Sequence, residues 1–389
     1  MILLKNGRIY TMAGKTYENG YVTIDGGKIA AVGAMETLRE TESSFTEVHD
    51  CTDCIVMPGM VDGHNHIGMW EDGLGFEGDD GNEDTDPIMP HLRALDAVNP
   101  LDRAFSEGLR AGVTTSVTGP GSANVLGGQF VALKMAGKCV DDMVVRAPVA
   151  VKAAFGENPK STYHDKNQTP TTRMATAALL REALIKAKEY SRTLAEYQEN
   201  PEEADKPEYD IKSESLLPVL DKKIPLKVHA HRSDDMFTAL RIAKEFDIKI
   251  TLEHATEAHL MTEYLDGTVP ILVGPLLCDR SKPELRNLTP GIAGILEDAG
   301  LAPAIITDHP EIPVQYLPVS AAIAVREGMP YMAALEAVTI RPAQYTGIAD
   351  RVGSLEAGKD ADIVVFDGDP LAYTSKPVMV WLNGKQVLV

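Results

Sequence analysis

Short apolar runs alternate with longer helix-forming segments through the middle of the chain, from about residue 56 to residue 350. The runs are apolar almost throughout, as expected for strands whose two faces are both covered. Alternation of this kind predicts a parallel sheet with helices outside it. The expected strands lie at 113–117, 144–155, 225–230, 248–254, 269–274 and 302–307, and the expected helices at 172–197, 235–246, 316–327 and 331–344.

This pattern predicts an α/β fold, a (β/α)8 TIM barrel over residues 56–350, with a first strand after residue 56. The third strand cannot be placed within residues 119–148, so the eight-fold count is an inference. A barrel of this kind takes ~250 residues, which fits the middle of a 389-residue chain. Two long polar stretches, 71–90 and 156–172, are predicted to be loops at the carboxyl end of the barrel.

The two ends of the chain resemble each other and differ from the middle. Residues 2–12 and 20–33 are β-rich runs around Asn-Gly and Asp-Gly-Gly, and the last residues repeat this pattern around Asn383-Gly384. These dipeptides favour hairpin turns. Because isolated hairpins are unstable, residues 1–55 and 351–389 are expected to pair into one small β-sandwich domain beside the barrel.

The formal net charge of −20 argues against a nucleic-acid partner, which requires basic patches. No stretch reaches the ~18 uninterrupted apolar residues of a membrane helix, and the first residues do not resemble a cleaved signal. A cytoplasmic location is therefore the expectation. Cys51 and Cys54 have C-x-x-C spacing, but no second pair follows, so two ordinary buried thiols are expected.

The strongest chemical signal is His64-Asn65-His66, which follows the apolar run 56–63. In an extended strand, residues i and i+2 point to the same side. His64 and His66 can therefore place two imidazoles on one metal ion, and imidazole suits zinc and other first-row ions.

Further polar residues lie at, or just after, the carboxyl ends of the other predicted strands. Catalytic barrels carry their reactive groups at this carboxyl rim. Any one of these residues could be a satisfied core side chain, but a chance series at successive strand ends is much less expected. The series comprises Lys152, Glu157, His229, His231, His254 and Asp308.

The segments PGMVDGHNH, VHAH, LEH and TDH, and the later RVGSLEAGKDADIVVFDGDP, resemble the amidohydrolase superfamily in type and order. The chain looks most similar to its imidazolonepropionase-related and prolidase-like branch. The resemblance implies that His64 and His66 bind a buried metal with Asp308. It further implies that His229 and His254 bind a second metal.

Lys152 matches the position at which prolidase-like members carry a carboxylated lysine that bridges two metals. An unmodified lysine beside two divalent cations would be strongly disfavoured. Two alternatives stay open: Glu157 as the bridge, or a one-metal site with Lys152 outside it. His231 could contact substrate or compete as a ligand.

The resemblance implies a hydrolase that uses a metal-bound hydroxide, with zinc as the default metal and two ions per chain. The substrate would be a small molecule with an amide, cyclic amide or dipeptide-like C–N bond. Asp308 would act as general base and then acid. Candidate substrate contacts are His231, Arg232 and Tyr163, and the loop 279–282 could also reach substrate. The sequence is compatible with a homo-oligomer.

Two other functions compete with this hypothesis. One is a mononuclear aminohydrolase acting on a heterocycle, with His64, His66, His229 and Asp308 as ligands and His254 as a catalytic group. The other is a non-catalytic scaffold of the same fold, which is disfavoured because each expected ligand position holds a competent residue.

Overall fold

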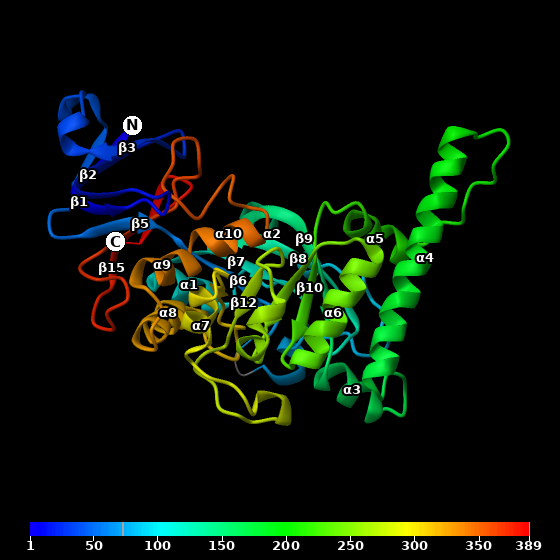
Figure 1. Ribbon diagram of the computed structural model, residues 1–389. Coiled ribbons are helices and arrows are strands. Elements are labelled where there is room, and N and C mark those ends of the chain that lie inside the picture. The colour runs from blue at the N-terminus through cyan, green and yellow to red at the C-terminus, as the bar shows by residue number, and fades with distance from the viewer. Residues whose placement is uncertain (72–73, 389) are drawn as a thin grey trace.

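A computed structural model describes residues 1–71 and 74–388; residues 72–73 of the predicted 71–90 loop lie outside the described residues. Eight strands form one curved sheet whose first and last members also contact each other, which nearly closes a barrel (Figure 1). The TIM-type barrel is thereby confirmed. Its strands in spatial order are β6 (Met60–Asn65), β7 (Val113–Thr118), β8 (Leu126–Lys134), β9 (Val144–Ala154), β10 (Leu226–Ala230), β11 (Ile250–His254), β12 (Ile271–Val273) and β13 (Ala304–Ile305).

The third barrel strand, β8, runs antiparallel to both of its neighbours. Only residues 119–125 separate it from β7, and β9 follows after residues 135–143, which hold the single-turn helix α2 (Val140–Met143). Antiparallel strands need no crossover helix between them. The alternation of strand and helix therefore breaks at this point, which explains why the third strand could not be placed from the sequence.

The helices cover the outside of the barrel, and the predicted ones are present. The predicted helix 331–344 is divided into two, because Pro342 cannot donate a backbone hydrogen bond to the preceding turn. No described helix is both long and apolar enough to cross a membrane. The helices are α1 (Arg103–Arg110), α3 (Glu157–His164), α4 (Arg173–Glu199), α5 (Ile211–Leu220), α6 (Ser233–Phe246), α7 (Ile292–Asp298), α8 (Leu317–Arg326), α9 (Tyr331–Ala337) and α10 (Ile340–Tyr345).

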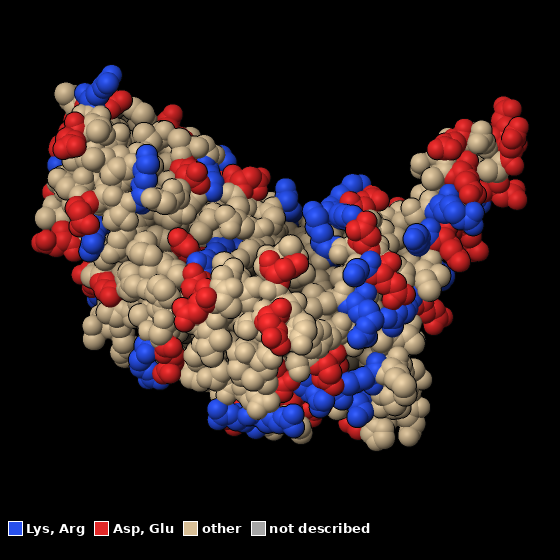
Figure 2. Space-filling model, viewed as in Figure 1, with Lys and Arg blue, Asp and Glu red and all other residues tan. Residues whose placement is uncertain are grey.

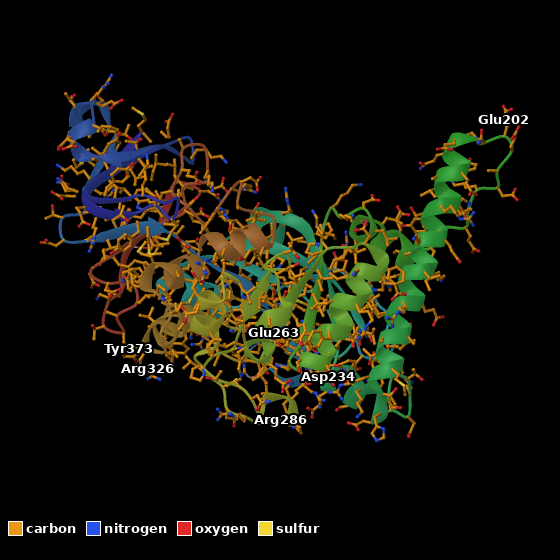
Figure 3. The ribbon with its side chains drawn as sticks, viewed as in Figure 1. Glu202, Asp234, Glu263, Arg286, Arg326 and Tyr373 are labelled. Carbon is orange, nitrogen blue, oxygen red and sulfur yellow. The ribbon has the colours of Figure 1, made fainter. Side chains whose placement is uncertain are left out.

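The longest helix, α4, is preceded by Thr172, whose hydroxyl accepts a hydrogen bond from the Ala175 N–H and caps the first turn. Its buried residues recur from Thr176 to Ala187 and then stop. The remaining turns therefore have no core to cover, and they project from the body with Glu202 near the tip (Figures 1 and 3).

Strands from both chain ends form a second sheet, as expected. Its order is β16-β15-β14-β5-β1-β2-β3, with β4 on β1, and its core includes Leu4, Val22, Ile363 and Trp381. The division of the chain into two domains stays a prediction. The strands are β1 (Ile2–Tyr10), β2 (Thr16–Asp25), β3 (Lys28–Ala34), β4 (Glu47–Asp50), β5 (Ile55–Pro58), β14 (Ile363–Phe366), β15 (Pro377–Leu382) and β16 (Lys385–Leu388).

The apolar run 56–63 does not form one strand. Residues up to Pro58 pair with the chain-end sheet, and the barrel strand begins at Met60. The intervening Gly59 passes so close to Thr114 that a Cβ would lie 2.0 Å from the Thr114 Oγ1. Consequently the chain changes from one sheet to the other just before the two histidines.

One turn prediction is wrong. Asn6-Gly7 lies inside β1, where Asn6 has a φ of 66° and the pairing with β2 shifts register. The dipeptide therefore forms an irregularity in a continuous strand rather than a hairpin. The turns at Gly26-Gly27 and Asn383-Gly384 do join antiparallel strands.

The C-x-x-C cysteines lie beside the chain-end sheet and are both free. Cys51 is buried, and burial raises its pKa to about 12. Cys54 is only partly buried. A thiol with such a raised pKa is a poor nucleophile and a poor metal ligand at neutral pH, in agreement with the expected structural role.

Candidate functional site

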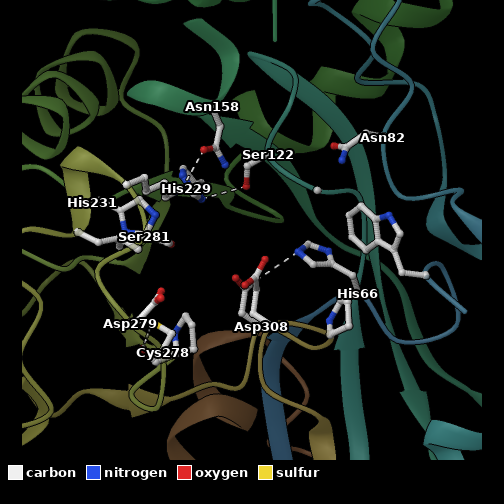
Figure 4. A pocket seen from close by; sticks show the side chains of 17 residues that line it. His66, Asn82, Ser122, Asn158, His229, His231, Cys278, Asp279, Ser281 and Asp308 are labelled. Carbon is white, nitrogen blue, oxygen red and sulfur yellow. Dashed lines mark hydrogen bonds and ion pairs between the residues drawn. The ribbon is translucent and has the colours of Figure 1, made fainter. Parts of the chain in front are cut away.

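The carboxyl ends of the barrel strands bring the predicted ligands to one rim (Figure 4). Parallel strands place their carboxyl ends at the same edge of the sheet, so residues distant in sequence meet there. The seam between the first and last strands is held by the Thr307 hydroxyl, which donates to Asp62, and by the Asp308 N–H, which donates to the His64 carbonyl at 3.2 Å. This seam fixes Asp308 beside the two histidines.

The first cluster consists of His64, His66 and Asp308. The Nε2 atoms of His64 and His66 lie 3.6 and 3.3 Å from the Asp308 Oδ1. All three residues offer ligand atoms within 4.8 Å of one another, as a shared metal ion requires. The structure thus brings together the set predicted for the buried metal.

Lys152 lies next to this cluster. Its Nζ is 3.2 Å from the His64 Nε2, and the side chain is fully buried. Burial lowers the pKa of Lys152 to about 8, although the Asp308 and Glu253 carboxylates oppose this shift. With this pKa, part of the Lys152 amine is neutral near pH 7. The neutral amine is the form that reacts with CO2.

The second cluster consists of His229, His231 and Glu284, which also offer ligand atoms within 4.8 Å of one another. The Nε2 atoms of the two histidines lie 3.9 and 3.6 Å from the Glu284 Oε1. His254 lies between the clusters, with its ring centroid 4.5 Å from that of His229 and 5.4 Å from that of His64. A metal ion bound by His229 could therefore take as its further ligands either His254 or the pair His231 and Glu284.

Each of the five site histidines has its Nδ1 beside an acceptor. For His64 the neighbour is the Glu253 Oε2 at 3.0 Å, but this contact is not a hydrogen bond, and the buried Nδ1 has no hydrogen-bond partner among the described residues. An Nδ1 bonded to an acceptor leaves the Nε2 lone pair free, which is the usual arrangement of metal-binding histidines. The other four Nδ1 atoms bond the Gly119 carbonyl (from His66, 2.6 Å), the Ser122 hydroxyl (His229, 2.9 Å), the Thr256 hydroxyl (His231, 2.8 Å) and the Gly274 carbonyl (His254, 2.8 Å).

The chemical state of these rings also suits a metal. Burial lowers the pKa of His64, His229 and His231 well below the usual value, and it lowers that of His254. Neutral imidazole is the ligand form. The buried Nε2 atoms of His229 and His254 have no hydrogen-bond partner among the described residues. Orphaned lone pairs of this kind are costly unless something binds them.

The backbone is unusual at two of these residues. His254 and Asp308 have φ values of 64° and 57°, in the left-handed region that non-glycine residues seldom adopt. Such conformations persist where the surrounding structure holds them, often at functional sites. Here they turn the last side chain of β11 and the third residue after β13 toward the rim.

A cavity of about 440 Å³ opens above the clusters and reaches His66, His229, His231 and Asp308. It is large enough for a small-molecule substrate. Its remaining wall combines an aromatic ring with polar and charged groups, including Trp70, Ser122, Asn158, Asp279, Lys282 and Glu311. Figure 4 shows Asn158, Ser122 and Asp279 around the same opening as the histidines.

Three residues singled out from the sequence lie elsewhere. Arg232 and Glu157 line a neighbouring cavity of about 480 Å³, and Arg232 pairs with Asp234. Tyr163 is fully buried, and its hydroxyl donates to the Asn124 Oδ1 at 2.6 Å. Glu284 of the second cluster also lines this neighbouring cavity and accepts a hydrogen bond from the Glu157 N–H at 2.9 Å, but none of the three side chains lines the main cavity, whereas His231 does.

Glu284 was missed by the sequence reasoning. It lies in a short 3-10 turn, Pro283–Leu285, two residues after the 279–282 segment that was expected to reach substrate. Its carboxylate is buried against Lys282, whose Nζ lies 3.1 Å from the Oε1. The sequence offers no strand end or motif at this position, so only the path of the loop reveals it.

Comparisons with known proteins agree with this geometry. A family model described as "Amidohydrolase family" matches residues 55–387. The chain is 32% identical over 362 residues to "Amidohydrolase tasK" of Hapsidospora irregularis, covering 87% of this chain and 37% of that protein. The chain therefore spans little more than a third of that relative.

Two further matches cover nearly the whole length of both proteins. An imidazolonepropionase of Fusobacterium nucleatum is 25% identical over 408 residues, covering 95% of this chain and 91% of the relative. The crystal structure of an amidohydrolase from Thermotoga maritima MSB8 is 40% identical, covers 100% of both chains and superposes with a TM-score of 0.95.

Proposed function

This chain belongs to the amidohydrolase family, and we propose that it hydrolyses a C–N bond of an amide, cyclic amide or dipeptide-like substrate with the help of bound divalent metal ions. The observation that carries the proposal is the convergence of imidazoles, each with Nδ1 beside an acceptor, on the Asp308 carboxylate below an open cavity. Buried polar atoms in folded proteins are normally hydrogen-bonded, so the unpaired Nε2 atoms of His229 and His254 support a site for a bound metal ion.

We assign the first metal to His64, His66 and Asp308. The second is assigned to His229 and His254, with His231 and Glu284 as the alternative partners of His229. When bound, a divalent ion supplies Lewis acidity, which polarises a carbonyl group and lowers the pKa of water. Zinc fits this nitrogen-rich set of ligands.

We propose that Lys152 is carboxylated and bridges the two ions. Its buried Nζ beside His64, and its pKa of about 8, support this role. The position of Glu157 in the neighbouring cavity makes it the weaker candidate for the bridge.

Asp308 is the proposed proton carrier. Although burial disfavours its charge, His254, His66 and Lys152 hold its pKa below the usual value, so the carboxylate is ionised at neutral pH. It lines the cavity and can accept the proton of the attacking water, whose oxygen bonds the carbonyl carbon. When the C–N bond breaks, Asp308 returns this proton to the leaving nitrogen.

A mononuclear aminohydrolase is the second candidate, and one observation favours it. His254 belongs to neither group of converging ligand atoms, so it is available as a catalytic group rather than a ligand. In that case the substrate would be a heterocycle whose amino group is removed by hydrolysis, and one metal ion per chain would suffice.

Metal counting combined with a substrate panel tests both candidates. We expect two zinc equivalents per chain by plasma mass spectrometry, and turnover of a member of a panel of Xaa-Pro dipeptides, N-acyl amino acids and cyclic amides. One equivalent and deamination of aminated heterocycles would instead establish the aminohydrolase. A protein that takes up no metal from metal-replete medium would exclude both candidate functions.

A further inference from the structure

Two charged side chains that the proposed reaction does not use are buried beneath His64. Lys227 of β10 and Glu253 of β11 have exposed fractions of 1% and 0%. The Lys227 Nζ donates to the Glu253 Oε2 at 2.8 Å, and the same oxygen lies 3.0 Å from the His64 Nδ1. The second contact lacks hydrogen-bond geometry, so Glu253 bonds a lysine on one side and lies close to a proposed metal ligand on the other.

The backbone of β11 makes this arrangement possible. Consecutive strand residues normally point to opposite faces, yet Glu253 contacts His64 while the next residue, His254, contacts Asp308 in the same interior. The left-handed φ of His254 breaks the alternation. The end of β11 consequently supplies a candidate metal ligand, His254, and also the Glu253 carboxylate, which lies behind His64.

The carboxylate distinguishes His64 from the other site histidines. The other four rings are held by carbonyl or hydroxyl oxygens, which carry no net charge. An anion beside Nδ1 keeps the proton on that nitrogen and makes Nε2 a stronger electron donor toward a metal. Lys227 compensates the charge, without which a buried carboxylate would be very costly.

Phe130 of β8 encloses the group. Its ring centroid lies 5.1 Å from that of His64, and the Lys227 and Lys152 Nζ atoms each lie 5.7 Å from the same centroid. Because apolar surroundings strengthen electrostatic interactions, the Glu253 carboxylate acts on His64 with little screening.

We propose that Glu253, neutralised by Lys227, is a positioning residue that orients His64 and raises its affinity for metal. The inference rests on the proposed function, because it requires His64 to be a metal ligand. It predicts a defect in metal binding itself, which can be measured without any substrate.

The test compares Glu253→Gln with Asp362→Asn, a matched change in another buried lysine–carboxylate pair that lies away from the rim. Apo protein of each variant is titrated with Zn²⁺ against a chromophoric chelator, and folding is checked by thermal denaturation. We expect Glu253→Gln to bind zinc about 10–100-fold more weakly than wild type. Asp362→Asn should lower the melting temperature without changing zinc affinity.

A folded Glu253→Gln protein with wild-type zinc affinity would overturn the inference, and so would an equal loss in Asp362→Asn. If Glu253→Gln does not fold, neutron diffraction from the zinc-loaded wild type decides. In the zinc-loaded protein, a His64 ring whose Nδ1 hydrogen bonds Glu253 supports the proposal, and an Nδ1 that makes no such bond even with zinc present refutes it. A wild type that binds no zinc would instead refute the proposed function.

Discussion

Two groups of polar and charged side chains lie in different parts of the molecule, and they differ in how their buried members are paired. One is the rim of the barrel. The other, which we call the junction cluster, lies where the chain-end sheet meets the barrel and consists of Lys28, Lys134, Arg351, Asp360 and Asp362.

In the junction cluster, opposite charges meet directly. Asp360 lies 2.6 Å from the Lys28 Nζ, 2.9 Å from the Lys134 Nζ and 2.8 Å from the Arg351 Nη2, and Asp362 also pairs with Lys134. Three cations thus surround two carboxylates. Satisfied networks of this kind specify how two parts of a fold are joined.

At the rim, by contrast, electron-donor atoms face one another. The Nε2 atoms of His229 and His254 have no hydrogen-bond partner in the described part of the chain. The two regions therefore differ in how their buried polar atoms are paired: nitrogen lone pairs stay unpaired at the rim, whereas both carboxylates of the junction cluster have cationic partners. On the outer face shown in Figure 2, acidic and basic side chains are interspersed. The two regions therefore differ in the pairing of their buried groups rather than in surface charge.

The largest expected effect comes from removing the proton carrier at the rim. Asp308→Asn should fold normally and lose about 10²–10⁴-fold in kcat, because the amide cannot accept the water proton. Steady-state kinetics at saturating zinc measure the loss. Glu311→Gln, which changes another carboxylate of the same cavity, serves as the matched variant and should lose far less. A fully active Asp308→Asn enzyme would exclude Asp308 from the reaction.

The next effect falls on stability at the junction. Lys134→Met removes the cation shared by Asp360 and Asp362 and leaves buried carboxylates short of a partner. Breaking such a pair costs about 3–5 kcal/mol. Urea unfolding should detect this loss while the zinc content per chain stays unchanged. If the zinc content fell together with stability, the two regions could not be treated as independent.

A smaller effect depends on pH. Although burial opposes it, the lysines and Arg351 lower the pKa of Asp360 to about 2, below the value of about 4 expected in the unfolded chain. Its stabilisation, about 2 kcal/mol, is therefore complete above pH 4 and is lost as the pH falls toward 2. The stability difference between wild type and Asp360→Asn should shrink over this range in urea titrations. A difference that is constant between pH 5 and pH 3 would contradict the assignment.

The sequence predicted the parts of the molecule that follow periodic patterns. The barrel, the pairing of the chain ends, and the family first indicated by PGMVDGHNH and VHAH are confirmed. The antiparallel β8 escaped prediction because hairpin connections replace its helices. Glu284 escaped because a loop determines its position. Lys227 and Glu253 escaped because they occur inside strands, where the apolar pattern drew attention only to the strand ends.

The smallest effect concerns Arg232, which the sequence suggested as a clamp for a substrate carboxylate. It lines the neighbouring cavity rather than the one above the metal clusters, and its guanidinium bonds Asp234 at 2.9 and 2.8 Å near the start of α6 (Figure 3). Both side chains are exposed, and exposed pairs contribute about 0–1 kcal/mol. Arg232→Ala should therefore leave KM unchanged for a substrate with a free carboxylate. A tenfold or greater rise in KM, absent for the matching amide substrate, would show instead that Arg232 reaches the substrate, and the two cavities would then have to be treated as one site.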